Sequence, residues 1–280
     1  MKQLQNNIKI GISGLGLIGG SIFKALVNKG FTQIFAHSQN TETISKIKAI
    51  GFNADKDISI LKECDVIFVC SPISATINSV KSMHKTNQNA IILDTASLKA
   101  DILEEIEKIE NCKFIGSHPM AGTENSGFDA AFGDLFIGAK WILTPSKYAV
   151  QNDIELIKEI INTIGAKPLI MDSKEHDKAV AMISHMPMLL SQSLMLSVIN
   201  NESCLKLASS GFRDMTRLAM SNKTMAKDML TLNKTNIKKS LETIIENANK
   251  LLSSNYFDDN IDKIISSRQN LYNHEGKNIY

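Results

Sequence analysis

The sequence predicts an α/β protein: an N-terminal doubly wound parallel sheet followed by an all-α C-terminal domain. Three observations predict this fold class. Short aliphatic runs alternate with helix-like stretches as far as Asp172, a glycine-rich turn follows the first of those runs, and no convincing strand follows Asp172. A chain of 280 residues is long enough for two domains. We therefore expect domains at residues 1–172 and 173–280.

The first part of the chain has the βαβ rhythm of a doubly wound sheet. Aliphatic runs without polar alternation are typical of parallel strands that are covered on both faces. They predict strands at residues 8–13, 33–36, 65–70, 90–95, 113–117, 141–145 and 167–172. The stretches between them predict helices at residues 17–29, 42–50, 73–85, 100–110 and 151–164.

The second part is helical by its pattern. Helices are expected at residues 174–199, 203–221, 223–231, 233–254 and 257–273. Residues 179–199 are long enough to span a membrane, but His185, Pro187 and Gln192 lie inside this segment. We expect a helix that is buried in a core or a subunit interface, with a kink at Pro187 and no membrane contact.

The composition is that of a soluble globular protein, with 43% hydrophobic and 21% charged residues. A net charge of +2 and the lack of a dense Lys/Arg run argue against a nucleic-acid partner. The four cysteines are scattered, which favours free thiols in a reducing compartment. The N-terminus lacks the apolar region of a signal peptide, so a cytoplasmic protein is expected.

The segment GLGLIGGS at residues 14–21 predicts a dinucleotide site. It contains GxGxxG after the first expected strand and at the start of the first expected helix, which is the context of a Rossmann-type phosphate loop. The alternative is a plain structural turn. Glycine suits a tight turn, a close approach to pyrophosphate and close helix–strand packing, and the helix N-terminus attracts the anion. The expected contacts are Gly14, Gly16, Leu17, Ile18 and Gly19.

The adenosine end of this site leaves NAD and NADP both open. The second strand has no acidic residue at its end to bind a ribose 2′-hydroxyl, and no arginine lies nearby to bind a 2′-phosphate. His37 and Ser38 could hydrogen-bond either cofactor. Ser71 and Pro72, which follow the strand expected at 65–70, complete the predicted cofactor contacts.

Polar side chains follow two neighbouring strands, where open α/β sheets bind their ligands. DTASLK contains Ser97, and SHPMAGTE contains His118. An imidazole can accept a proton near neutral pH, and a hydroxyl beside it can orient base and substrate. The alternative is a capping serine and an ordinary loop histidine. The position in the cofactor crevice favours catalysis.

GFRDMTR at residues 211–217 holds two of the three arginines of the chain. A planar guanidinium suits bidentate capture of a carboxylate, so Arg217 is the expected anchor, oriented by Asp214, with Arg213 beside it. The alternative is an intrahelical Arg–Asp pair. His185 could face the substrate or be a core histidine. No metal site is expected, because the possible ligands lack metal-site spacing.

Together these motifs resemble the family of prephenate and arogenate dehydrogenases. GLGLIGGS, D-x-x-S-x-K, SHPMAGTE-x-SG, SHMP and GF-x-D-x-TR occur in that family in this order, over about residues 8–255. The resemblance implies that His118 is the base for the ring hydroxyl, supported by Ser97. It also implies that Thr123 and Glu124 line the pocket, that Arg217 binds a carboxylate with Asp214 as its partner, and that the helical domains form a homodimer.

The chain departs from the family pattern at Ala96, where glycine is usual, at Met188, where SHLPH has its second histidine, and at Ala226, where an aromatic residue is frequent. These departures leave the substrate open. The expected function is oxidative decarboxylation of prephenate to 4-hydroxyphenylpyruvate with NAD(P)+. The alternatives are an arogenate dehydrogenase, a β-hydroxyacid-type dehydrogenase using Lys174 or Lys178, and a dinucleotide-sensing protein without turnover.

Overall fold

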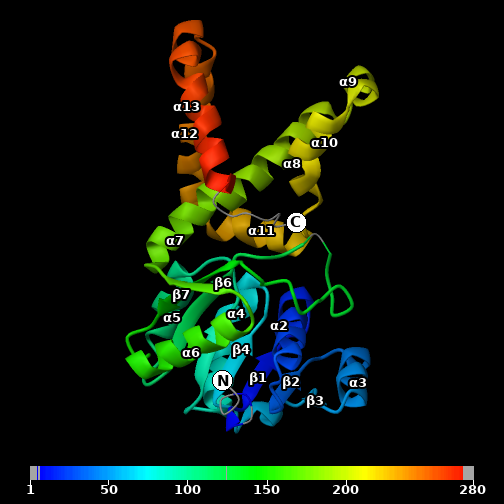
Figure 1. The fold of residues 1–280 in the computed structure, drawn as a ribbon, viewed down its shortest axis with the longest axis vertical. Helices are drawn as coiled ribbons and strands as arrows, with labels where there is room; N and C mark the ends of the chain where they lie inside the picture. Colours follow the sequence, from blue (N-terminus) through cyan, green and yellow to red (C-terminus); the bar gives the residue numbers. More distant parts are fainter. Residues whose placement is uncertain (1–4, 6, 124, 274–280) are drawn as a thin grey trace.

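A computed structural model describes residues 5, 7–123 and 125–273 of the chain. The first part of the chain forms a layered α/β body, and the second part forms helices that stand beyond one end of it (Figure 1). The sheet gives way to helices between Ile170 and Ser173.

The described strands form one eight-stranded sheet in the order β3-β2-β1-β4-β5-β6-β7-β8. Every neighbouring pair is parallel except β6 and β7, which are antiparallel. The predicted α/β fold class is confirmed. The strands are β1 (Ile10–Ser13), β2 (Ile34–His37), β3 (Asn53–Asp55), β4 (Val66–Val69), β5 (Ile91–Asp94), β6 (Phe114–Pro119), β7 (Lys140–Pro145) and β8 (Lys167–Ile170).

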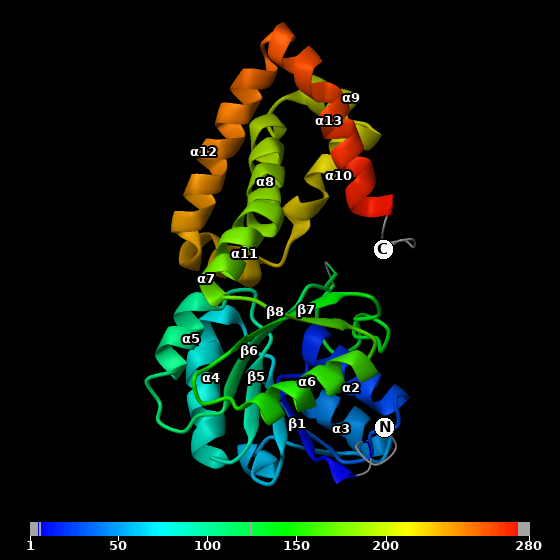
Figure 2. The same cartoon turned by 60° about the vertical axis from the view of Figure 1, so that its left-hand side comes forward.

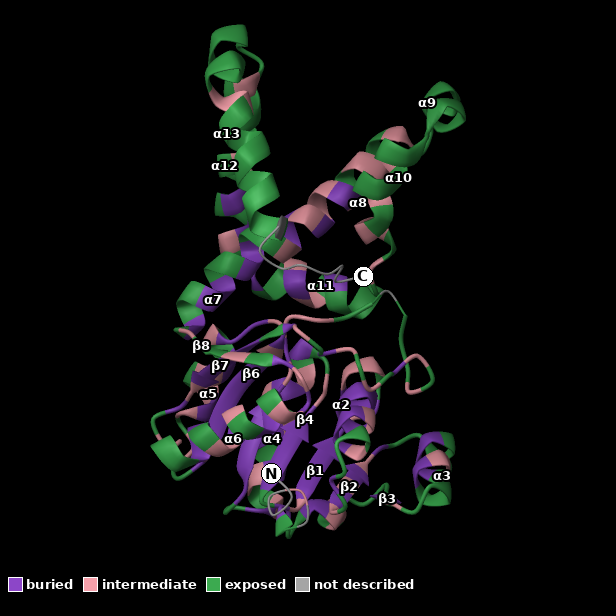
Figure 3. Ribbon diagram, in the orientation of Figure 1, coloured by how far each residue is buried: buried purple, intermediate pink, exposed green. Residues whose placement is uncertain are grey.

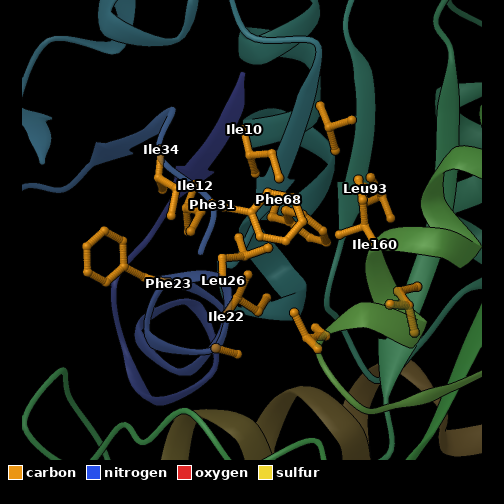
Figure 4. Packing of buried hydrophobic residues seen from close by; sticks show 14 of the residues in the cluster. Ile10, Ile12, Ile22, Phe23, Leu26, Phe31, Ile34, Phe68, Leu93 and Ile160 are labelled. Atoms are coloured by element: carbon orange, nitrogen blue, oxygen red, sulfur yellow. The ribbon is translucent and has the colours of Figure 1, made fainter. Parts of the chain in front are cut away.

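Helices cover both faces of this sheet, and each face has its own apolar cluster. On one face, α2 (Leu17–Asn28), α3 (Thr41–Ala49) and α6 (Gln151–Thr163) bury isoleucine, leucine and phenylalanine side chains against the strands (Figure 4). On the other face, η1 (Ile58–Leu61), α4 (Ile73–Thr86) and α5 (Ala100–Ile106) do the same. Burial on both faces explains why the strands lack polar alternation.

Two features of the sheet differ from the sequence-based expectation. Strand β3 was not expected, because it has three residues and only Ala54 is buried, too few for a pattern. The other is the direction of β7. The connection from β6 to β7 contains no helix in its described residues, and a parallel pair would need a crossover, usually helical. The chain therefore returns beside β6 in the antiparallel direction.

The second part consists of α7 (Ser173–Val180), η2 (Ala181–His185), α8 (Met186–Val198), α9 (Glu202–Leu207), α10 (Ser210–Thr216), η3 (Arg217–Met220), α11 (Lys223–Leu232), α12 (Lys234–Leu251) and α13 (Ser254–Asn273). The helix expected at 203–221 is interrupted at Ala208, whose backbone is extended. Figure 2 shows α12 and α13 as a long hairpin.

The effect of Pro187 on the helix backbone appears in the turn that precedes it. It lies in the first turn of α8, where its missing N–H is not needed. The preceding segment η2 is π-helical, and the N–H of Met186 bonds to the carbonyl of Ala181, five residues back. The expected kink thus takes the form of a widened π turn that ends at His185.

The continuous helical segment Ser173–Val198 is the one described helix that is long and apolar enough to cross a membrane. Its mean hydropathy is 1.4, and 33% of its apolar window is buried within the single chain. Core helices of soluble proteins pass the same test. Figure 3 shows that the helical part exposes much more of its surface than the sheet part. Burial of this segment in an interface stays a prediction.

Candidate active site

The three motif glycines meet three different requirements in the turn between β1 and α2. Gly14 has φ of +91°, and a Cβ there would lie 2.5 Å from the carbonyl oxygen of Cys70. A Cβ on Gly19 would lie 1.9 Å from the carbonyl oxygen of Gly14. Gly16 is the N-cap of α2 and has open space around its missing Cβ. The turn thus leaves a cradle in front of the helix N-terminus, beside Leu17 and Ile18, that suits a pyrophosphate.

At the predicted adenosine end, His37 is held on both ring nitrogens. Nδ1 lies 2.9 Å from Ser13 Oγ, and Nε2 lies 3.3 Å from the amide nitrogen of Gln39. Desolvation lowers the pKa of His37, so the ring is neutral near pH 7. Ser38 is buried, and its Oγ accepts the N–H of Asn40. A neutral histidine bound in this way leaves NAD and NADP both open.

The segment after β4, which leads into α4, makes hydrogen bonds to the helical part. Ser71 Oγ lies 3.4 Å from Thr76 Oγ1, and Pro72 is the N-cap of α4. Asp228 of α11 accepts the backbone N–H of Ser74 at 3.0 Å and its hydroxyl at 2.9 Å. A carboxylate from the helical part therefore occupies the first turn of α4, next to the predicted cofactor loop.

His118 lies in β6, near the strand's carboxyl end, where it remains partly exposed. Its Nδ1 lies 2.9 Å from Nε2 of His176, and Nδ1 of His176 lies 2.8 Å from Oδ1 of Asp177. The two rings meet edge to face, with centroids 5.2 Å apart. His176 and Asp177 are buried and belong to α7. A residue of the sheet and two residues of the helical part thus form one hydrogen-bonded chain.

Asp177 is fixed by the backbone at the start of α5. Its Oδ1 accepts the N–H of Lys99 at 2.8 Å, and its Oδ2 accepts the N–H of Ala100 at 2.9 Å. The Lys99 side chain is buried and bonds to Asp94 and to the Ser117 carbonyl. Asp94 also accepts the N–H of Ser117, the residue before His118. This buried network holds the end of β6, and with it the histidine, in place.

The surroundings of His118 favour its neutral form. Desolvation of the ring is the largest cause, followed by the nearby His176, Lys99 and His185, and together they hold the pKa of His118 well below its ordinary value. At neutral pH the ring therefore has a free lone pair. A neutral imidazole at the carboxyl end of a strand can act as a general base.

The role of Ser97 beside His118 stays a prediction: its Oγ is buried and has no hydrogen-bond partner among the described residues, so no bond to His118 is formed there. The partner of His118 is His176. The reason is the fold: α7 follows β8 and returns to the end of β6, so its polar face reaches the base. Ser97 Oγ remains available to a ligand.

His185 is fully buried, which favours the second of its two readings, a core histidine. Its Nδ1 lies 3.1 Å from the side-chain nitrogen of Asn233. Its Nε2 has no partner among the described residues. Desolvation lowers the pKa of His185 to about 4.

The arginine segment lies on the surface of the helical part. Arg217 begins η3, and its neighbour Leu218 packs against the same apolar cluster as Met120, two residues after His118. Asp214 lies 3.5 Å from Arg213, and both side chains are more than 70% exposed, which matches the intrahelical alternative.

The remaining predicted pocket residues lie in the loop after β6. Thr123 is exposed, and its Oγ1 accepts the N–H of Asn125 at 3.3 Å. Glu124 lies outside the described residues. Among the residues that the structure describes, no group of three or more His, Cys, Asp or Glu side chains could hold a metal ion.

Sequence reasoning missed His176 and Asp177. The sequence held a signal for them, because Ser173, His176, Asp177 and Val180 have the i, i+3, i+4, i+7 spacing of one helix face, and the structure shows that face to be buried. A titratable pair on a buried stripe needs partners, and those partners are often functional.

The comparison with known proteins agrees with this geometry. Residues 22–170 match the family model described as the nucleotide-binding domain of prephenate dehydrogenase, and residues 172–264 match the model of its dimerization domain. The chain belongs to the prephenate dehydrogenase family. The resemblance inferred from the motifs is confirmed.

Among curated relatives, prephenate dehydrogenase of Bacillus subtilis is 30% identical over 90% of this chain and 70% of its own length. That of Lactococcus lactis is 32% identical over 80% of this chain and 65% of its own length. This chain thus spans about two thirds of these family members.

Two solved structures of the family cover almost the whole chain. Prephenate dehydrogenase of Aquifex aeolicus, in complex with hydroxyphenyl propionate and NAD+, has a TM-score of 0.81 at 28% identity, covering 96% of this chain and 95% of that one. Arogenate dehydrogenase of Synechocystis has a TM-score of 0.77 at 29% identity, covering 96% and 98%.

Proposed function

We propose that this chain catalyses the NAD(P)+-dependent oxidative decarboxylation of prephenate to 4-hydroxyphenylpyruvate. The observation that carries this proposal is His118: a neutral imidazole at the carboxyl end of β6, in a sheet whose first turn suits a dinucleotide. A nicotinamide bound at this turn would supply the hydride acceptor. The residues of this chain bind the substrate, orient it and take up a proton.

In this proposal His118 accepts the proton of the ring hydroxyl. At the same time, hydride leaves the ring carbon that bears this hydroxyl and passes to the nicotinamide. The ring carboxylate then departs as CO2, and its bonding electrons make the ring aromatic and leave a phenolate. The proton held by His118 returns to that oxygen, and aromatisation supplies the driving force. Ser97 Oγ, which has no described protein partner, can bond to the substrate hydroxyl. Arg217 binds a substrate carboxylate, since guanidinium suits a planar bidentate pair. Thr123 and Glu124 belong to the pocket by family resemblance.

The structure bears differently on the alternative enzyme functions that the sequence left open. Lys174 and Lys178 are exposed, whereas His176 between them is buried, so a lysine-based dehydrogenase is disfavoured. Arogenate dehydrogenase remains the second candidate, because Met188 is buried in the apolar cluster beside Leu218 and offers no polar contact to distinguish the substrates. The homodimer through the helical part, the division at residue 172 and a cytoplasmic location stay predictions.

The test is an assay of nicotinamide reduction with the purified full chain. Prephenate and arogenate are each combined with NAD+ and NADP+, and product is identified by mass. We expect turnover with prephenate and at least one cofactor. Turnover with arogenate alone would assign the second function. No turnover in any combination, together with measurable NAD+ or NADP+ binding, would leave the dinucleotide-sensing protein.

A further inference from the structure

The hydrogen-bonded chain from Asp177 to His118 has a direction. An ionised carboxylate only accepts hydrogen bonds. Oδ1 of Asp177 lies 2.8 Å from Nδ1 of His176, so the proton of this bond belongs to His176 Nδ1. If the His176 ring carries this single proton, its Nε2 is an acceptor, and the proposal below is built on that form of the ring.

The same reasoning fixes the ring of His118. Its Nδ1 lies 2.9 Å from the accepting Nε2 of His176, so Nδ1 of His118 must carry the proton. The lone pair of His118 is then on Nε2, the nitrogen that His176 does not contact. We propose that His176 and Asp177 are positioning residues, which hold His118 in the Nδ1–H form and leave Nε2 as the proton acceptor.

The contact between His118 and His176 also makes the state of His118 depend on how the helical part packs against the sheet. Asp177 is held by the N–H groups of Lys99 and Ala100, two and three residues after Ser97. Lys99 in turn is paired with Asp94 below the end of β6. Movement of α7 away from the sheet would break the bond to His118 and release its tautomer. The Nδ1–H form of His118 is therefore fixed only while α7 is docked. This inference rests on the proposed function only for the role of His118 as base.

The groups around His118 define what the variants should do. From α7 it faces His176 and, behind it, Asp177; from the loop after β5 it faces Lys99, which Asp94 balances; from η2 it is influenced by His185. Asp177 also caps α5, so its removal would disturb the fold. Substitution of His176 leaves that cap in place, which makes His176 the residue to change.

The direct test measures tautomers without turnover. Full-length protein labelled with nitrogen-15 at histidine is studied by long-range proton–nitrogen correlation at neutral pH, and the His118→Asn spectrum assigns the signals. We expect the Nδ1–H form at His118. The Nε2–H form would overturn the proposal. Because no substrate is needed, this result does not depend on whether the proposed function is correct.

The kinetic test compares His176→Gln with His176→Leu. A glutamine amide oxygen can take the place of Nε2 and accept the His118 proton, whereas leucine fills the space without accepting. We expect kcat of the leucine variant to fall by about 100-fold, with both KM values within roughly threefold, and glutamine to restore at least about tenfold of the loss. Equal loss in both variants, or a fall confined to KM, would refute a positioning role.

Discussion

The chemistry of His118 depends on its surroundings more than on its own ordinary basicity. Desolvation, followed by His176, Lys99 and His185, lowers its pKa well below the ordinary 6.5. A base acts in its neutral form, so activity is lost as pH falls through the lowered pKa. We expect kcat/KM for prephenate to stay level from neutral pH down to 6.5 and to fall only below 6.5. Initial rates at constant ionic strength test this, and an acid limb above that value would contradict it.

Removal of the imidazole should abolish proton acceptance and little else. His118→Asn keeps a polar side chain of similar reach, but its amide cannot take up a proton near neutral pH. We expect kcat to fall by at least about 100-fold at neutral pH, the usual scale for a positioned base. The KM for NAD(P)+ should stay within roughly twofold. Unchanged turnover would remove His118 from this role.

The arginine segment offers a matched pair of variants. Arg217 is the proposed carboxylate anchor, whereas Arg213 lies against Asp214 on the surface. Arg217→Ala should raise the KM for prephenate by about tenfold or more with a smaller effect on kcat, because the contact exists before and during the transition state. Arg213→Ala should leave KM within roughly twofold, since exposed ion pairs contribute little. Equal effects from the two variants would place the anchor elsewhere.

At the scale of elements, we expect different roles for two glycines in the turn before α2: Gly19 is needed for packing, and Gly16 for cofactor binding. A Cβ on Gly19 would lie 1.9 Å from the Gly14 carbonyl oxygen, whereas a Cβ on Gly16 meets open space. Gly19→Ala should therefore destabilise the protein by about 1–3 kcal/mol, as overpacking does. Gly16→Ala should leave the free energy of unfolding unchanged but raise the KM for NAD(P)+ by roughly tenfold, because the methyl group points where a pyrophosphate would lie. Denaturant unfolding and cofactor titration measure the two effects.

The elements also show what the sequence can and cannot predict. Seven of the eight strands have continuous aliphatic runs and were predictable from pattern alone. Most of them are buried on both faces, although β8 is largely exposed. The glycine turn was predictable because each glycine has its own steric reason. Strand β3 was not, since a three-residue edge strand carries no period. Ser97 was predicted beside His118 because both follow neighbouring strands at their carboxyl ends and because the family resemblance pairs them. The contact with His176 was not predictable in this way, because it depends on how α7 returns to β6.

For the molecule as a whole, the two parts differ in how much of their apolar side-chain surface is buried within the chain. The sheet part buries most of its large aliphatic side chains on both faces, whereas the helical part exposes many of its own (Figure 3). Leu196 of α8 is 74% exposed, and Leu207, Met220 and Leu252 are also largely exposed. Large apolar side chains left exposed in this way are what an interface with another chain would cover. This agrees with the match of residues 172–264 to a dimerization domain.

The predicted homodimer can be tested with one charge placed on each part. Leu196→Asp puts a carboxylate on the apolar side of α8. Burial of that unpaired charge in an interface would weaken dimer association strongly, because the charge would lose its hydration. Ile50→Asp is the matched control, because Ile50 is 58% exposed at the end of α3 in the sheet part. Sedimentation velocity should show a dimer for the unmodified chain and the control, and a monomer for Leu196→Asp at the same concentration. A monomer from the Ile50 variant alone would place the interface on the sheet part instead, and a monomeric unmodified chain would leave the exposed face of α8 without a second copy to cover it.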